Sequence, residues 1–253
     1  MEPIPISNPF PGAVCLLVAS TLSTQAEARI MAGNRHLPGQ AFPPGSLVAA
    51  QRQSEGRGRF PERTWESEAG KNLIFTIFLE AGTATLPGLP IRIGSALCEA
   101  VESLALSPRL KWPNDLMLGD RKAAGILCEA GPSGVFAGIG LNCNQLAFPG
   151  ELATRATSLA TELGREVDRW ALLGRFLEAL AASLGDALWR EKAEARLWKM
   201  GESLGFLEGR GSLVARIEGI DAEGSLLLRE VESAVVRPHA AGELTTDLPP
   251  YRV

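Results

Sequence analysis

One short stretch, residues 111–129, restricts the fold of this chain more than any other part of its sequence. Its sequence is KWPNDLMLGDRKAAGILCE, with two lysines, an Asn-Asp pair and a Trp-Pro step. Proline lacks a backbone N–H and has a fixed φ, so the stretch does not suit the interior of a helix. The Asn-Asp and Gly-Asp pairs are typical of turns between short strands. The stretch is therefore predicted to be a hairpin-like β unit.

The segments around this unit predict helices and strands in alternation. The apolar strand at 72–79 alternates poorly, as expected of a strand that is buried on both faces. Helices are expected at 23–31 and at 88–106, the second with Pro87 and Pro90 near its start. A helical region is also expected over 169–204, where apolar residues recur at a spacing of roughly 3–4 residues. A loop rich in Pro and Gly is expected at 33–45. Further strands are expected at 13–19, 46–51, 110–112, 117–118, 122–129 and 135–141.

The composition changes after Leu204. Residues 205–243 form a series of short alternating strands separated by glycines, which suggests a small barrel or sandwich. We therefore expect a boundary near Gly205. Residues 1–204 are predicted to be an α/β catalytic domain, and residues 205–253 a β appendage of about 45 residues.

Size and composition limit the classes of function. With 253 residues and 45% hydrophobic content, the chain can bury one large core, or one large and one small core. The net charge of −4 and the pI near 5.4 argue against nucleic acid and membrane surfaces as partners. No signal peptide and no apolar run of roughly 18 residues is seen, so a cytoplasmic protein is expected. The four scattered cysteines are expected to be buried thiols, without a disulfide framework or a zinc site.

Two glycine-rich segments suit the binding of anions. In Gly56-Arg57-Gly58-Arg59, glycines let backbone N–H groups approach a ligand, and arginines add a planar charge matched to carboxylate or phosphate. The same tetrapeptide also fits a solvated surface loop, an RNA-binding arm or a lid. The second segment, Gly138–Asn142, lacks the third glycine of a dinucleotide-binding loop, and the chain has no Gly-x4-Gly-Lys-Ser/Thr loop and no Gly-x-Ser-x-Gly motif.

The hairpin-like unit carries a third group of polar residues. Lys111 and Lys122 are predicted to lie on neighbouring strands, and the small residues after Lys122 leave room for a ligand. Either lysine could equally be an ordinary surface residue. Asn114 and Asp115 either form a turn after Pro113 or bind Mg²⁺, a cation that takes one or two carboxylates together with phosphate oxygens.

In their order and spacing, these segments resemble the successive motifs of the biotin–protein ligases. The resemblance covers about residues 20–243 and includes a C-terminal barrel signature. It implies an α+β fold, in which a mixed β-sheet with flanking helices (the biotin/lipoate ligase-like catalytic domain) is followed by a small SH3-like β-barrel. The matching residues are Ser23-Thr24-Gln25, Gln53-x2-Gly56-Arg57-Gly58-Arg59, Lys111-Trp112-Pro113-Asn114-Asp115, Arg121-Lys122-x2-Gly125-Ile126-Leu127-x-Glu129, Gly138-x-Gly140-x-Asn142-x-Asn144, Ala156-Thr157-Ser158-Leu159, Gly219-x-Asp221-x2-Gly224 and Gly242-Glu243.

The resemblance also implies a reaction and a role for each matching residue. Biotin reacts with ATP to give biotinyl-5′-adenylate, and a lysine of a biotin carboxyl carrier domain then accepts the biotin, with Mg²⁺ as the metal. The implied catalytic residues are Lys122, Arg59 and Arg57. The implied biotin-binding residues are Ser23, Thr24, Gln53, Gly56, Arg57, Lys122, Gly125, Gly138 and Gly140. The implied ATP-binding residues are Arg59, Arg63, Trp65, Lys111, Asn114, Asp115 and Asn142, with Asn114 and Asp115 as the Mg²⁺ ligands.

The arginine-rich segment departs from the family pattern after Arg59. The sequence from Phe60 to Trp65 contains one extra residue, and Pro61 stands where the family has a glycine. Pro61 is expected to stiffen a lid over the site, and Glu62 to add negative charge near it. Only about twenty residues precede Ser23, too few for the DNA-binding helix-turn-helix of some relatives, so an enzyme without repressor function is expected. A homodimer is left open.

Two other functions stay open at this point. Lipoate/octanoate–protein ligases share the implied fold and the lysine-containing strand, although the Gly-Arg-Gly-Arg and Lys-Trp-Pro-Asn-Asp segments favour biotin. A non-catalytic homologue would use its C-terminal barrel as a binding module. The presence of Lys122, Arg57 and Arg59 together counts against that alternative.

Overall fold

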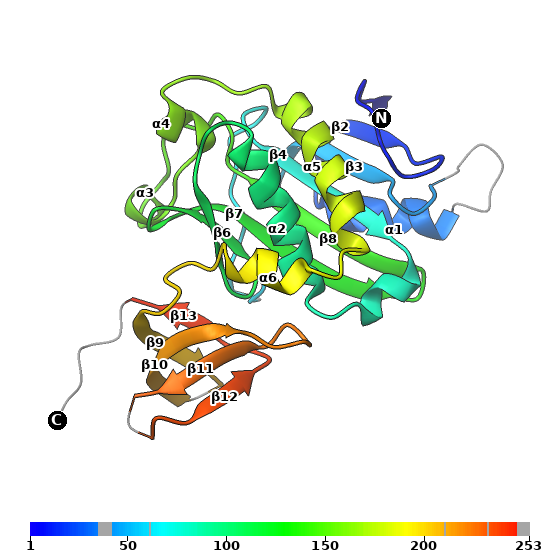
Figure 1. Cartoon of the computed structure of the whole chain (residues 1–253). Coiled ribbons are helices and arrows are strands. Elements are labelled where there is room, and N and C mark those ends of the chain that lie inside the picture. Colours follow the sequence, from blue (N-terminus) through cyan, green and yellow to red (C-terminus); the bar gives the residue numbers. More distant parts are fainter. Residues whose placement is uncertain (35–41, 61, 210, 232, 247–253) are drawn as a thin grey trace.

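The structure, a computed structural model, describes residues 1–34, 42–60, 62–209, 211–231 and 233–246. A large mixed sheet with helices on both faces stands above a smaller antiparallel sheet (Figure 1). Part of the loop predicted at 33–45, and Pro61 of the arginine-rich loop, lie outside the described residues. Among the described helices, none combines the length and the apolar character that crossing a bilayer requires.

The large sheet is almost entirely antiparallel. Its strands follow the order β1-β2-β3-β4-β8-β7-β6-β5. Among the described strands, β2 and β3 alone pair in parallel, because helix α1 (Thr24–Asn34) lies between them in the chain and returns it to the same end. The strands are β1 (Glu2–Pro3), β2 (Cys15–Thr21), β3 (Leu47–Gln53), β4 (Leu73–Leu79), β5 (Pro108–Lys111), β6 (Asp115–Leu118), β7 (Arg121–Gly131) and β8 (Gly134–Leu141).

The central strands are buried on both faces, which explains the poor alternation in the sequence of β4. Leu47 and Ile77 pack in the larger core together with helices α2 (Leu89–Glu102) and α5 (Arg169–Leu184). Their neighbours in the chain, Val48 and Phe78, pack in a second cluster with residues of α1. Successive side chains of a strand point to opposite faces, so each face of the sheet needs its own helical cover.

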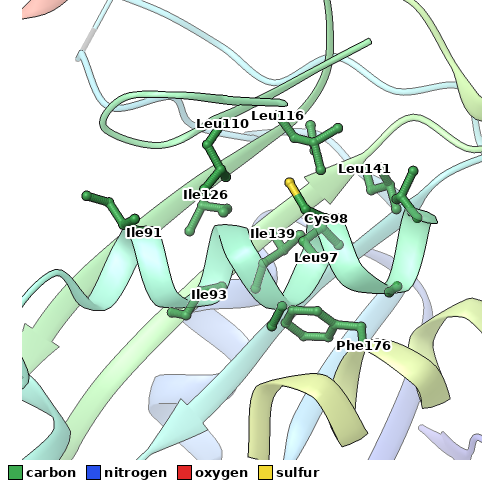
Figure 2. Packing of buried hydrophobic residues seen from close by; sticks show 14 of the residues in the cluster. Ile91, Ile93, Leu97, Cys98, Leu110, Leu116, Ile126, Ile139, Leu141 and Phe176 are labelled. Atoms are coloured by element: carbon green, nitrogen blue, oxygen red, sulfur yellow. The ribbon is translucent and has the colours of Figure 1, made fainter. Parts of the chain in front are cut away.

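Helix α2 forms the centre of the larger core. Eleven of its 14 residues are buried, because it lies between the sheet and α5. Pro90 lies in its first turn, as predicted, where the missing N–H has no helical partner to lose. The labelled residues in Figure 2 are Ile91, Ile93, Leu97 and Cys98 of α2, Leu110, Leu116, Ile126, Ile139 and Leu141 of the strands, and Phe176 of α5.

The prediction of one helical region over 169–204 is wrong in its second half. Helix α5 ends at Leu184, and a short helix α6 (Trp189–Glu194) follows. The backbone then pairs with the edge of β5: Leu110 N donates to Arg196 O at 2.7 Å, and Trp198 N donates to Leu110 O at 2.8 Å. Peptide groups that bond to a strand cannot continue a helix, so the residues after α6 form turns around an isolated bridge between Leu197 and Leu110.

The prediction that Lys111 and Lys122 lie on neighbouring strands is also wrong. Lys111 ends β5 and Lys122 lies near the start of β7, and β6 runs between the two strands. The chain reverses at Asn114 and again at Gly119, as the predicted turns imply, so the strand between these turns separates the two lysines.

The C-terminal residues form a five-stranded antiparallel sheet. Its order is β12-β11-β10-β9-β13, and the described strand pairs leave β12 and β13 as its two edges. The coarse prediction of a separate β structure is confirmed, but the closed SH3-like barrel is not. The strands are β9 (Ser203–Glu208), β10 (Gly211–Ile220), β11 (Leu226–Glu230), β12 (Val236–His239) and β13 (Glu243–Thr245); the remaining short helices are η1 (Ala81–Thr85), α3 (Leu152–Arg155) and α4 (Leu159–Leu163).

Hydrogen bonds to the turn between β10 and β11 help to attach this smaller sheet to the rest of the protein. The indole Nε1 of Trp112 donates to the carbonyl of Gly224 at 3.0 Å, and the backbone N of Gly88 donates to Glu223 O at 3.1 Å. The rings of Trp112 and Phe206 lie 6.3 Å apart between the sheets. The smaller sheet therefore lies against the end of the large core that carries β5 and the start of α2.

Candidate active site

A small cavity lies beside the N-terminus of α1, where β7 and β8 pair. Its volume is about 70 Å³. The sequence-predicted residues that line it come from four segments far apart in the chain. The lining residues are Ser23, Thr24, Gln25, Gln53, Arg57, Gly58, Arg59, Trp65, Ile74, Phe75, Asn114, Lys122, Gly125, Ile126, Leu127, Gly138, Ile139 and Gly140.

One wall of the cavity is a network of hydrogen bonds between polar side chains, two of them the buried threonines Thr24 and Thr76. Gln53 Oε1 accepts from the backbone N of Thr24 at 2.8 Å and from its hydroxyl at 3.2 Å. The hydroxyl of Thr24 also lies 2.9 Å from that of Thr76 on β4. Buried polar groups need such partners, and here the partners fix the first turn of α1 against the end of β3 and the middle of β4. Gln53 and Thr24 thereby keep fixed positions at the cavity.

The floor of the cavity is made of glycines on two paired strands. Gly125 on β7 is directly opposite Gly140 on β8. Gly138 lies two residues before Gly140 on β8, on the same face of the sheet. A Cβ atom at Gly140 would lie 2.3 Å from the indole of Trp65, and one at Gly138 would lie 2.9 Å from the Gln25 amide. Glycine is needed here because it has no side chain, and not for an unusual backbone conformation.

Lys122 brings its charge to the edge of this floor. Its Nζ lies 2.6 Å from Asp115 Oδ1 on the neighbouring strand β6 and 5.9 Å from the centre of the Trp65 ring. The side chain of Lys122 is 37% exposed and that of Asp115 is 19% exposed. The ion pair therefore fixes the direction of the ammonium group while leaving it open to a ligand.

The arginine-rich loop covers the cavity as a narrow hairpin. Gly58 N donates to Arg63 O at 2.8 Å, and Trp65 N donates to Gly56 O at 2.9 Å. Arg57 and Thr64 pair as an isolated bridge between these two bonds. Because the two sides of the hairpin are joined, its arginines and the Trp65 indole move together.

Two arginines of the loop contact the C-terminal sheet. Arg59 Nη2 donates to the carbonyl of Gly242 at 2.7 Å. Arg63 donates from Nη1 and Nη2 to the two carboxylate oxygens of Glu243 at 2.8 and 2.9 Å. Both guanidinium groups lie over the ring of Phe60, at 4.6 and 4.7 Å. Burial lowers the pKa of Arg59, whereas the hydrogen bonds to Glu243 raise that of Arg63.

Lys111, Asn114 and Asp115 lie together in a smaller hollow next to the cavity. Asn114 lines both spaces, and its Nδ2 donates to Ile126 O at 2.9 Å. Burial lowers the pKa of Lys111, although the charges of Asp115 and Glu243 act in the opposite direction. The structure thus places Lys111 and Lys122 on the two sides of one carboxylate, Asp115.

Known proteins are similar to this sequence over most of its length. The model of the biotin/lipoate A/B protein ligase family matches residues 19–145, which are 127 of the 253 residues. A biotin–[acetyl-CoA-carboxylase] ligase of Paracoccus denitrificans is 34% identical over 244 residues, covering 88% of this chain and 98% of that protein. This chain belongs to the biotin/lipoate A/B protein ligase family.

Two further similar proteins are a longer bifunctional ligase and a ligase whose structure was determined with ligands. The bifunctional ligase/repressor BirA of Bacillus spizizenii is 30% identical over 226 residues, covering 83% of this chain and 67% of that protein. This chain therefore spans about two thirds of that relative. The structure of the biotin protein ligase from Aquifex aeolicus in complex with biotin and ATP is similar with a TM-score of 0.78 and 28% identity, covering 91% of this chain and 97% of that one.

Two of the predicted site residues of this family member lie behind the cavity wall. The Asn142 amide is buried and donates from Nδ2 to Thr157 O at 3.0 Å. Gly56 is packed against the loop itself, since a Cβ there would lie 2.4 Å from Trp65 O. Neither lines the cavity. Asn142 is held against the segment after β8, and Gly56 allows the loop hairpin to close.

The residues present could hold a magnesium ion only together with a substrate. No group of three or more His, Cys, Asp or Glu side chains with metal-binding geometry occurs in the described part of the chain. Asp115 supplies one carboxylate, and Asn114 supplies an amide oxygen beside it. This donor set suits Mg²⁺, which commonly takes one or two carboxylates and completes its shell with phosphate oxygens and water.

Sequence reasoning did not assign three residues that matter for the site. Thr76 had a signal, since it is a lone polar residue in an apolar strand, and such a residue needs a buried partner. Gly242 and Glu243 were noticed as part of the barrel signature only. Their contacts with Arg59 and Arg63 join residues about 180 positions apart in the chain, and no local pattern predicts such a contact.

Proposed function

We propose that this chain is an ATP-dependent biotin–protein ligase, which activates biotin as biotinyl-5′-AMP and transfers it to a lysine of a biotin carboxyl carrier domain. The position of Lys122 carries the proposal. Its ammonium stands at the edge of a glycine-floored cavity, under a loop that presents Arg57 and Arg59. The relatives support the same reaction, since one is named a biotin–[acetyl-CoA-carboxylase] ligase and another was determined with biotin and ATP.

The first step joins biotin to AMP. A carboxylate oxygen of biotin attacks the α-phosphorus of ATP, and the bond to the bridging oxygen breaks as pyrophosphate leaves. Negative charge accumulates on the phosphoryl oxygens in this transition state, so fixed cations lower its energy. Lys122 bridges the biotin carboxylate and the α-phosphate. Arg57 and Arg59 bring two further positive charges from the loop, and the carboxylate of Asp115 at 2.6 Å keeps the Lys122 ammonium in place.

Biotin lies on the glycine floor in this proposal. Its ureido ring meets the polar wall of Ser23, Thr24 and Gln53, of which Thr24 and Gln53 are already fixed by hydrogen bonds to each other. Preorganised donors and acceptors reduce the ordering cost of binding. Once the Trp65 indole has lifted, the glycine floor places no side chain in the way of the chain that carries the carboxylate toward Lys122.

ATP lies beside biotin in this proposal, on the side of Lys111, Asn114 and Asp115. The space there measures only about 10 Å³, so it has to widen when ATP binds. The charge of Asp115 acts on Arg59 and Arg63, and we assign Arg59, Arg63 and Trp65 to ATP together with Asn142, whose amide donates to Thr157 O. Asn114 and Asp115 are the residues that would hold Mg²⁺, which supplies additional positive charge near the phosphates when it is bound.

The second step transfers biotin to the carrier. The lysine amine of the carrier attacks the acyl carbon of the mixed anhydride, the bond from that carbon to the phosphate oxygen breaks, and AMP leaves as the amine loses its proton. The closed arginine-rich loop keeps water from the anhydride between the two steps. The loop is therefore expected to open for the carrier after the adenylate has formed.

The remaining assignments belong to the same proposal. We assign residues 1–204 to the catalytic domain and 205–253 to a C-terminal domain of the SH3-like barrel type. The partner is a biotin carboxyl carrier domain of a biotin-dependent carboxylase, without nucleic acid or membrane, and a homodimer stays open. The first strand of the smaller sheet begins at Ser203, close to the predicted boundary at Gly205.

ATP–pyrophosphate exchange tests the proposal. Purified protein is incubated with ATP, Mg²⁺ and labelled pyrophosphate, and with biotin, lipoate or octanoate in turn. Exchange that depends on biotin is expected, because the first step is reversible only when the correct acid is bound. Exchange with lipoate or octanoate instead would assign the chain to that branch of the family, and no exchange with any acid would favour a binding role.

A substitution at Lys122 tests the residue assignment. Lys122→Ala is expected to lower biotin-dependent exchange by at least a hundredfold, because it removes the cation between the two reacting anions. Lys71→Ala is the matched control. Lys71 forms an exposed ion pair with Glu166, in which Nζ and Oε1 are 3.2 Å apart, and it does not line the cavity. The assignment fails if Lys122→Ala, with an unchanged circular dichroism spectrum, retains exchange close to that of the control.

A further inference from the structure

Glu243 forms an ion pair with Arg63, a cation that the proposed reaction needs for binding phosphate. Its carboxylate accepts both arms of the Arg63 guanidinium, at 2.8 and 2.9 Å. The side chain of Glu243 is only 24% exposed, whereas that of Arg63 is 54% exposed. The Nη1 and Nη2 end of a guanidinium forms a planar fork that fits a carboxylate or a phosphate equally well and takes one of them at a time, while Nε–H and the outward N–H groups remain outside it. Arg63 therefore cannot bind Glu243 and a phosphate with the same two donors.

The position of Glu243 is fixed by the core of the C-terminal sheet. Glu243 opens β13 and pairs with Leu207 on β9, and its neighbour Leu244 is buried. The preceding residue, Gly242, has a φ of +137° and packs so closely on Phe206 that a Cβ would lie 2.2 Å from the ring. The carbonyl that accepts from Arg59 and the carboxylate that accepts from Arg63 are thus held on a rigid edge.

The charges around Glu243 show that it balances more than one cation. Burial by itself raises the pKa of Glu243, but the hydrogen bonds from Arg63 and the charges of Arg63, Lys111 and Arg59 together bring that pKa below its ordinary value. On the other side of the cavity, Asp115 is paired with Lys122. Two carboxylates of the chain thus neutralise part of the charge of the four cations Arg59, Arg63, Lys111 and Lys122.

From this geometry we infer that Glu243 is an internal counter-anion, which holds the arginine-rich loop closed over the empty site and gives up Arg63 to the phosphates of the substrate. The inference rests on the proposed function for the identity of those phosphates, which are those of ATP and pyrophosphate. Glu243 is a positioning residue in this scheme and touches no reacting atom. A polyphosphate carries more charge than one carboxylate, so the exchange of partners favours the phosphate.

Replacing the carboxylate by an amide separates the two effects of Glu243. Glu243→Gln keeps the shape of the side chain but removes its charge, so the loop loses an ion pair and the phosphates lose a competitor. Loop opening is expected to become several-fold more frequent, and pyrophosphate to bind about three- to tenfold more tightly at low salt. Glu230→Gln is the matched control, because Glu230 forms an ion pair with Arg237 at 3.3 Å on the same sheet, away from the cavity.

Limited digestion with trypsin measures the first effect without any substrate. The loop offers cleavage sites after Arg57, Arg59 and Arg63, and the fragments are identified by mass spectrometry. Cleavage of Glu243→Gln between residues 57 and 63 is expected to be several-fold faster than that of the wild type and of Glu230→Gln. If Glu243→Gln does not fold, Arg63→Gln breaks the same pair from the loop side and should speed cleavage after Arg57 and Arg59. Unchanged cleavage in the folded variant overturns the inference.

Calorimetric titration with pyrophosphate measures the second effect. Tighter binding to Glu243→Gln than to the wild type, with Glu230→Gln unchanged, supports the competition. Equal or weaker binding to Glu243→Gln overturns it, even if the loop is cleaved faster. If the wild type neither binds pyrophosphate nor catalyses exchange while the loop contact passes the digestion test, the proposed function fails and the role of Glu243 in holding the loop stands.

Discussion

The glycine floor leads to a prediction whose size follows from the distances. A Cβ atom added at Gly140 would lie 2.3 Å from Cε2 of Trp65 and 2.6 Å from its Nε1. Ordinary van der Waals contact begins near 3.4 Å, so the indole must move by about 1 Å, the difference between 3.4 and 2.3. Gly140→Ala therefore pushes the loop away from the floor on which we place biotin.

The loop has little freedom to absorb this shift. Trp65 N is bonded to Gly56 O at 2.9 Å, and Gly56 is already packed against the Trp65 carbonyl. Inserting a methyl group into a packed site typically costs about 1–3 kcal/mol. When the loop closes again over biotin, the ligand has to fit between the floor and the indole, and the added methyl group takes up part of that space. We therefore expect this cost in ligand affinity and not in the stability of the sheet. A penalty of about 1.4–2.8 kcal/mol corresponds to a dissociation constant for biotin that is about ten- to a hundredfold higher.

Calorimetry with biotin and thermal unfolding separate these two costs. Gly174→Ala on α5 is the control, since nothing lies within 4 Å of a Cβ there and Gly174 does not line the cavity. The decisive test is the double-mutant cycle with Trp65→Ala, in which Gly140→Ala should cost little once the indole is gone. Additive effects of Gly140→Ala and Trp65→Ala on the affinity for biotin would refute the steric argument.

Two predictions concern stability. Arg92 is buried and donates from Nη1 to Ser183 O and Asp186 O, each at 3.0 Å. Arg92→Leu should therefore lower the free energy of unfolding by about 2–4 kcal/mol. A loss below about 1 kcal/mol, measured by urea unfolding, would contradict this. The hydrogen bonds from Arg196 hold the pKa of Glu102 below its ordinary value. The stabilisation from this pair is therefore present above about pH 4.3 and is lost as the pH falls through the lowered pKa, so the difference in unfolding free energy between wild type and Glu102→Gln should shrink on acidification. A difference that stays constant from pH 7 to pH 3.5 would show that the ion pair does not contribute.

Much of the fold could be predicted because its strands carry strong local signals. The segment at 72–79 is apolar throughout, and the structure shows the reason, since Ile77 faces the larger core and Phe78 the cluster under α1. The turns at Asn114 and Gly119 were recognised from their residue types, and the strands between them were placed correctly. Lys111 and Lys122 were nevertheless predicted to lie on neighbouring strands, although the strand predicted at 117–118 runs between them as β6.

The errors have a common cause, which is that distant pairing overrides local pattern. Leu197 lies in a stretch with helical spacing, but its neighbours bond to Leu110 at the edge of β5. The edge strand offers unpaired peptide groups, and satisfying them stabilises the turns and the bridge at Leu197 over another helical turn. Local sequence carries no information about that edge, so the end of the helical region could not be predicted from its own residues.

The candidate site was predictable as a set of residues but not as a closed space. The motifs named Lys122, Trp65 and the glycines, and the structure brings them around one cavity of about 70 Å³. Ligand sites in proteins usually measure about 300–1,000 Å³, so the space is too small for biotin while the indole rests on the glycine floor. The loop must lift for biotin to enter, and its contacts with Gly242 and Glu243 oppose that movement. The energy of those contacts therefore belongs to the cost of binding, which makes the C-terminal sheet part of the site although it contributes no residue to the cavity wall.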